Sequence, residues 1–166
     1  KVDHKKVTFV NRYGITLAAD LYKPKNASGK YPAIAVSGPF GAVKEQCSGL
    51  YAQTMAERGY LTIAFDPSFT GESGGYPRFM ASPDINTEDF MAAVDFLSVR
   101  EDVDPDKIGI IGICGWGGMA LNAAALDTRI KATVASTMYD LTRANANGYF
   151  DSEDSEEARY AKKQSL

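Results

Sequence analysis

The stretch Ile108-Gly109-Ile110-Ile111-Gly112-Ile113-Cys114-Gly115-Trp116-Gly117-Gly118 decides the fold of this chain. Residues 108–113 are apolar apart from glycine, which predicts a strand buried on both faces, as in a parallel sheet. The glycines around Cys114 predict a sharp turn, and residues 119–126 predict a helix after it. This order of elements places Cys114 at the carboxyl end of a strand and above the amino end of a helix.

Strands and helices alternate on both sides of this stretch. Residues 7–10 and 15–21 flank the turn Asn11-Arg12-Tyr13-Gly14 and predict an antiparallel hairpin. Further apolar runs predict three more buried strands, at 33–36, 60–65 and 130–136. The alternation predicts an α/β three-layer sandwich.

Two more helices are expected between these strands. One covers residues 49–58 and ends at Gly59. The other is expected to start at Asn86 as its N-cap and to stop at Asp104-Pro105-Asp106. Its predicted apolar stripe has helical spacing: Phe90, Ala93, Val94 and Leu97.

Composition limits the functional classes. A length of 166 residues suits one domain, and the net charge of −3 argues against nucleic acid as a partner. No apolar run has the length of a membrane span, and two cysteines do not form a disulfide framework. With one histidine, a histidine-rich metal site is excluded. No secretory leader is visible, so we expect a cytoplasmic location, while a homo-oligomer is compatible with the sequence.

The predicted turn is suited to nucleophilic chemistry. The positive end of the helix dipole favours the thiolate form of Cys114. The N–H of Gly115 points to where an oxyanion would form. Cys47 has no acid, base or glycine pattern around it and is interpreted as a structural thiol.

At these residues the chain resembles the α/β-hydrolase superfamily. The stretch around Cys114 is similar to dienelactone hydrolase-related and Xaa-Pro-peptidase-like acyl hydrolases, several of which carry Cys in place of Ser. Residues 31–41, 66–75 and 103–109 resemble the oxyanion loop, the Asp…Gly-x-Ser stretch and the entry to the nucleophile strand, in the family's order. The similarity covers about residues 5–140. Trp116 stands where the family usually has the first following glycine.

The resemblance implies a three-layer α/β-hydrolase fold with a mostly parallel sheet, an N-terminal antiparallel hairpin and an incomplete C-terminus. Residues 1–140 would form the N-terminal part of the hydrolase core, and residues 141–166 the start of a cap or lid. The acidic run 151–157, followed by Lys162-Lys163, predicts a solvated surface helix with charges that complement its dipole.

The resemblance also implies the roles of individual residues. Cys114 is the expected nucleophile, with oxyanion donors at Gly115 and at Phe40, since Pro39 has no N–H. Trp116 is a candidate for lining the acyl pocket, and Asp140 is a candidate acid. Asp66 is expected to hold the loop 71–75.

The family triad runs nucleophile, acid, histidine along the chain. The single histidine, His4, lies far before Cys114. We therefore interpret His4 as a surface residue and expect the base and the acid downstream of this segment, which alone would turn over little substrate.

The leading interpretation is an acyl hydrolase for a small carboxylester, thioester or lactone, acting through a cysteine acyl-enzyme without metal or organic cofactor. A catalytically silent interaction module of the same fold is an alternative. A dinucleotide-binding module is another, because Gly115-x-Gly117-x-x-Ala120 matches its glycine pattern and Asp140 lies near the expected acidic position.

Overall fold

The computed structural model describes residues 2–25 and 28–165. Its elements, in chain order, are β1 (Val2–Val10), β2 (Thr16–Pro24), β3 (Tyr31–Ser37), α1 (Cys47–Glu57), β4 (Leu61–Phe65), α2 (Pro83–Ser98), β5 (Val103–Ile113), α3 (Gly115–Leu126), β6 (Ile130–Ser136), α4 (Leu141–Asn147), the 3₁₀ turn η1 (Tyr149–Asp151) and α5 (Glu156–Gln164).

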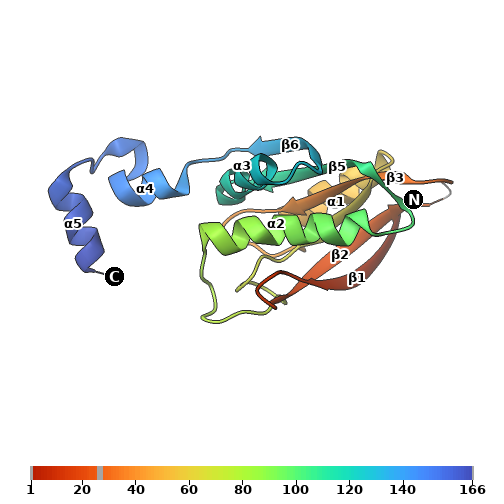
Figure 1. Ribbon diagram of the computed structural model, residues 1–166, viewed down its shortest axis with the longest axis horizontal. Coiled ribbons are helices and arrows are strands. Elements are labelled where there is room, and N and C mark those ends of the chain that lie inside the picture. Colours follow the sequence, from red (N-terminus) through yellow and green to blue (C-terminus); the bar gives the residue numbers. More distant parts are fainter. Residues whose placement is uncertain (1, 26–27, 166) are drawn as a thin grey trace.

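The strands form one mixed sheet in the order β1-β2-β4-β3-β5-β6. β1 pairs with β2, and β2 with β4, in antiparallel fashion, while β4, β3, β5 and β6 are parallel. Helix α1 covers one face of the sheet, and α2 and α3 cover the other (Figure 1). The predicted α/β-hydrolase architecture, with its N-terminal hairpin and parallel centre, is therefore confirmed.

Two apolar clusters hold the layers together. The larger cluster lies between the sheet and the pair α2–α3, and includes Phe65, Phe90, Leu97 and Trp116. The smaller cluster lies under α1 and consists of Ile34, Val36, Ala52, Ala64, Ile111 and Ile113. The central strands contribute to both clusters, which explains why their sequences are continuously apolar.

Asn86 does not cap α2, contrary to the sequence prediction. The helix begins at Pro83, and the N-cap is Ser82, whose hydroxyl accepts a hydrogen bond from the N–H of Ile85. Proline suits the first helical position because an N–H at that position has no partner within the helix, so its absence costs nothing. Asn86 is instead buried inside the helix, where its amide donates to Asp89.

Two further predictions on the second half of the chain are wrong. Helix α2 ends at Ser98, and Asp104-Pro105-Asp106 lies inside β5 rather than at a helix end. Strand β6 is not buried: it forms the edge of the described sheet, and residues such as Val134 are exposed. An apolar hollow of about 390 Å³ lies over β3, β5 and β6, beside Met55 and Tyr60.

After β6 the chain leaves the sheet. Figure 1 shows α4 and α5 extending away from the core. Helix α5 has no buried residue, carries Glu156 and Glu157 in its first turn and Lys162 and Lys163 in its last, and thus confirms the predicted surface helix. That residues 141–166 begin a cap stays a prediction. None of the helices in the described ranges is long and apolar enough to cross a membrane.

Candidate active site

Cys114 occupies the bend between β5 and α3. Its backbone has φ 58° and ψ −126°, a region that non-glycine residues rarely adopt and that stores strain. The bend is held because the Cys114 N–H donates to the Ser136 carbonyl at 2.9 Å and its own carbonyl accepts from the Gly117 N–H at 3.0 Å. The thiol is partly exposed. The geometry is that of a nucleophile elbow, in which a strained turn lifts one side chain above the sheet.

Glycine is required on both sides of this bend. A Cβ atom at Gly112 would lie 2.2 Å from the Trp116 carbonyl oxygen, and one at Gly117 would lie 2.6 Å from Cβ of Met138. The backbone of α3 therefore packs directly on β5, and Gly117 is in contact with the segment after β6. Of the residues in the dinucleotide-binding pattern, Gly117 is thus explained by packing within the chain.

The two expected oxyanion donors come from loops that meet at this end of the sheet. Gly115 is the first residue of α3, where N–H groups have no partner within the helix. The ring of Phe40 packs edge-on against Trp116, with ring centroids 5.9 Å apart, so the loop after β3 lies beside the elbow. The donor roles of Gly115 and Phe40 stay predictions, but the two residues lie at the same end of the sheet.

Trp116 lies in the large apolar cluster rather than on an open surface. Its side chain is 1% exposed, and its indole Nε1 has no hydrogen-bond partner among the described residues. The ring lies in the apolar cluster and packs against the ring of Phe40. Contact of Trp116 with a substrate stays a prediction, but it would require the ring to become accessible.

Tyr139 and Cys47 are neighbours of Cys114 that the sequence did not place there. The Tyr139 hydroxyl lies 3.5 Å from the position of a Cβ at Gly115. Burial raises the pKa of Tyr139, and a hydrogen bond with Tyr149 and the nearby Cys114 add to this shift. Burial also raises the pKa of the Cys47 thiol, again with a contribution from Cys114. No local pattern predicts these contacts, because they join segments far apart in the sequence.

Asp140 and His4 each form contacts of their own. Asp140 caps α4: its carboxylate accepts from the Thr142 hydroxyl and the Arg143 N–H, and these hydrogen bonds lower its pKa. His4 lies on β1, 3.0 Å from Asp20 and stacked on Tyr22. Strands β2, β4 and β3 separate β1 from β5. The role of Asp140 as the catalytic acid stays a prediction. Its hydrogen bonds within α4 explain an aspartate at this position without any contact to a ribose.

Asp66 holds the loop after β4, as predicted. One carboxylate oxygen accepts from the Glu72 N–H at 2.9 Å, and the Asp66 carbonyl accepts from the Ser73 hydroxyl at 2.6 Å. Gly71 approaches so closely that a Cβ there would lie 2.3 Å from the same carboxylate. Lys44, which the sequence did not single out, binds Asp66 from the other side.

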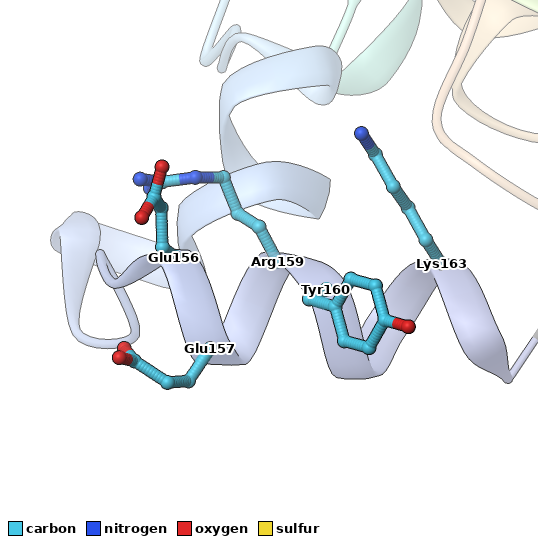
Figure 2. A pocket seen from close by; sticks show the side chains of 5 residues that line it. All are labelled: Glu156, Glu157, Arg159, Tyr160 and Lys163. Atoms are coloured by element: carbon cyan, nitrogen blue, oxygen red, sulfur yellow. The ribbon is translucent and has the colours of Figure 1, made fainter.

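Two surface hollows lie at α3 and at α5. One, of about 210 Å³, lies against Gly115 and Gly118 and is also lined by Met138, Asp140 and Leu141. The other lies along α5 (Figure 2) and is lined by side chains of that helix alone: Glu156, Glu157, Arg159, Tyr160 and Lys163. Only the first is next to the elbow. No group of three or more potential metal ligands occurs in the described part of the chain.

Comparison with known proteins agrees with this geometry. The protein PA2218 of Pseudomonas aeruginosa is 72% identical over 153 residues, covering 92% of this chain and 41% of that protein. Its crystal structure superposes with a TM-score of 0.96 at 67% identity, over 99% of this chain and 51% of that one. The thiohydrolase aneE of Aspergillus aculeatus is 33% identical over 80% of this chain and 41% of its own.

A putative dienelactone hydrolase from Klebsiella pneumoniae shares the fold, with a TM-score of 0.70 at 24% identity over 83% of this chain and 60% of that one. The chain spans less than half the length of the curated relatives it matches. The family model for the X-Pro dipeptidyl-peptidases of family S15 matches residues 13–165. The elbow at Cys114, the sheet order and this match together show that the chain belongs to the S15 family within the α/β hydrolases.

Proposed function

We propose that the protein is an acyl hydrolase that cleaves a small carboxylester, thioester or lactone through an acyl-enzyme on Cys114. The observation that carries this proposal is the strained backbone of Cys114, with φ 58° at the junction of β5 and α3. A buried inert thiol does not need such a conformation, whereas an exposed nucleophile at an elbow does. The similarity to a protein named a thiohydrolase supports a thioester among the substrates.

The proposed reaction has two steps. The Cys114 thiolate attacks the acyl carbon, and the N–H groups of Gly115 and Phe40 stabilise the oxyanion. The C–O or C–S bond to the leaving group then breaks, and the leaving alcohol or thiol takes up the proton that a base removed from the Cys114 thiol. Water attacks the resulting thioester, releases the carboxylic acid and returns the thiol of Cys114.

The base and acid of this reaction are not supplied by His4, which the sheet keeps away from Cys114. The relatives are more than twice as long as the part matched here. We propose that a histidine and an acid from the corresponding further sequence complete the site. A catalytically silent member of the fold is the alternative, and the experiment below separates the two.

The test uses the full-length gene product with p-nitrophenyl acetate and the acetyl thioester of N-acetylcysteamine as probes. Wild-type protein should hydrolyse at least one of them and, after rapid acid quenching, carry an acetyl group on Cys114 that peptide mass spectrometry detects. Cys114→Ala should lose both signals.

Cys47→Ala is the matched control because it removes the other thiol, at the start of α1. It should keep both hydrolysis and acetylation. Hydrolysis that survives in Cys114→Ala would refute the assignment of the nucleophile, and absence of hydrolysis and acetylation in the wild type would favour the silent module.

A further inference from the structure

Lys44 is a fully buried lysine in the loop between β3 and α1. Its side chain is 0% exposed, and its Nζ donates to three carboxylates: Asp66 at 3.0 Å, Glu72 at 2.7 Å and Glu45 at 2.8 Å. A buried charge is costly unless it is paired and hydrogen-bonded, so such a lysine needs a specific reason to be there.

The position of Lys44 in the chain suggests that reason. It lies at the end of the loop that follows β3 and carries Phe40, the proposed second oxyanion donor. Hydrogen bonds inside this loop run from the Ala42 N–H to the Pro39 carbonyl, from the Val43 N–H to the Gln46 side chain, and from the Gln46 N–H to the Val43 carbonyl. They fix the shape of the loop but not its place above the sheet.

Lys44 supplies the connection to the sheet. Its backbone N–H donates to one oxygen of Asp66 at 2.7 Å, and its Nζ donates to the other oxygen at 3.0 Å. Asp66 is itself fully buried at the end of β4. Within the described ranges, these contacts and the bond from Nζ to Glu72 are the hydrogen bonds that join residues 39–45 to elements beyond the loop and α1.

The charges of Lys44 and its partners stabilise one another. Burial opposes the charge of Lys44, but hydrogen bonds to Glu45, Glu72 and Asp66 outweigh it and raise the lysine pKa above its ordinary value. Hydrogen bonds from Lys44 and Lys6 lower the pKa of Glu72 to about 2. The shifts of Lys44 and Glu72 both favour the charged form of the pair.

We propose that Lys44 is a positioning residue, which holds the loop 38–44 so that the Phe40 N–H stays beside the Cys114 elbow during acyl transfer. This inference rests on the proposed function. Lys44 does not touch the reacting atoms, and it acts through the loop. Loss of one oxyanion donor reduces kcat by roughly 10²–10³-fold in a well-studied protease, and a donor that is mobile rather than absent should lose part of that factor.

The test compares Lys44→Met and Lys44→Arg with the wild-type full-length protein. Lys44→Met should lower kcat for p-nitrophenyl acetate by about 10-fold or more with little change in KM, because the donor acts on the transition state. Its affinity for a trifluoromethyl ketone, which forms a tetrahedral adduct, should fall by a similar factor. Alkylation of Cys114 by iodoacetamide, which forms no oxyanion, should stay within about twofold of wild type. Lys44→Arg, which keeps the charge, should recover part of kcat.

Amide hydrogen exchange gives a readout that does not depend on activity. Exchange in the peptide covering 38–46 should become faster in Lys44→Met, while exchange in the peptide covering 112–118 stays unchanged. Because Lys44→Met leaves Asp66 buried without its cation, the double variant Lys44→Met/Asp66→Asn, which neutralises both partners, serves if the single variant fails to fold. Lys23→Met removes an ion pair with Asp102 at the other end of the sheet and is the control for loss of a salt bridge.

Three results would overturn the proposal. Unchanged exchange in 38–46 would show that Lys44 does not hold the loop, whether or not Cys114 is the nucleophile. Faster exchange with unchanged kcat would show that the position of the loop does not matter for the reaction. An equal fall in kcat and in the alkylation rate would mean that the elbow itself has moved. Failure of the proposed function appears separately, as activity that persists in Cys114→Ala.

Discussion

Gly112→Ala is predicted to destabilise the fold strongly. The added Cβ would lie 2.2 Å from the Trp116 carbonyl oxygen and 2.7 Å from Cβ of Ala120. Ordinary contacts between such atoms are about 3.5 Å or longer, so β5 and α3 must separate by roughly 1 Å. The first obstacle is a backbone atom, which cannot rotate away as a side chain can.

The expected cost follows from the size of this displacement. Overpacking a well-filled core by one methyl group costs about 1–3 kcal/mol, and a clash with backbone belongs at the upper end. We therefore expect Gly112→Ala to lower the free energy of unfolding by about 3 kcal/mol. Because Cys114 follows two residues later, the elbow should move as well, and the rate at which iodoacetamide alkylates Cys114 should change.

The assay is urea unfolding followed by circular dichroism, with Gly118→Ala as the matched control. That glycine lies in the first turn of α3, and a Cβ there would lie 3.4 Å from the Tyr139 carbonyl oxygen, an ordinary contact. Alanine is favoured over glycine in a helix by about 1 kcal/mol, so the control should be neutral or stabilised. Equal stability of the two variants would refute the packing argument.

Three further predictions concern the buried polar contacts. Asn11→Ala should lower the free energy of unfolding by about 3 kcal/mol, measured in urea, because the Asn11 amide donates to the buried Asp89 carboxylate at 2.9 Å; a loss no larger than that of an exposed asparagine would contradict this. Ser73→Ala should cost about 2 kcal/mol in the same assay, since the hydroxyl donates to one buried backbone carbonyl and accepts from one buried backbone N–H. The hydrogen bond from Arg129 lowers the pKa of Asp127, so the stabilisation by this pair is present above the ordinary Asp pKa of about 4 and is lost as the pH falls through the lowered value. The difference in Tm between wild type and Arg129→Met should therefore shrink on acidification, and a difference that grows would have the wrong sign.

The parts of the fold that sequence predicts are those with a local signal. The apolar runs at 33–36 and 60–65 became the central strands β3 and β4, because strands buried on both faces need apolar residues throughout. The glycine after α1 also predicts where this helix ends. Gly59 has φ 104°, which an L-residue with a side chain rarely adopts. The bend at Cys114 was visible for the same reason, since its glycines are close neighbours in sequence.

The predictions are wrong for β6 and for the start of α2, where the same residues are compatible with more than one structure. Strand β6 has the composition of a buried strand, but burial depends on what lies next to it, and β6 is the edge of the described sheet. At α2, Ser82 followed by Pro83 is a strong start signal that the prediction passed over in favour of Asn86. Asn86 is buried as a partner of Asp89, a contact that the sequence does not encode locally.

One part of the candidate site can be predicted from the sequence and the other cannot. The glycines of the elbow lie next to Cys114 in the chain, so they can be identified in the sequence, although Ser136 and Met138 after them also hold the bend. The support for the oxyanion loop joins Lys44 to Asp66 and Glu72, which are 22 and 28 residues away, and no spacing rule connects them. The proposed nucleophile and the proposed second oxyanion donor are therefore held by separate structures, one of close-packed backbone and one of buried charge. Damage to either one should be separable in experiment: alkylation of Cys114 reports on the first, and stabilisation of a tetrahedral adduct reports on the second.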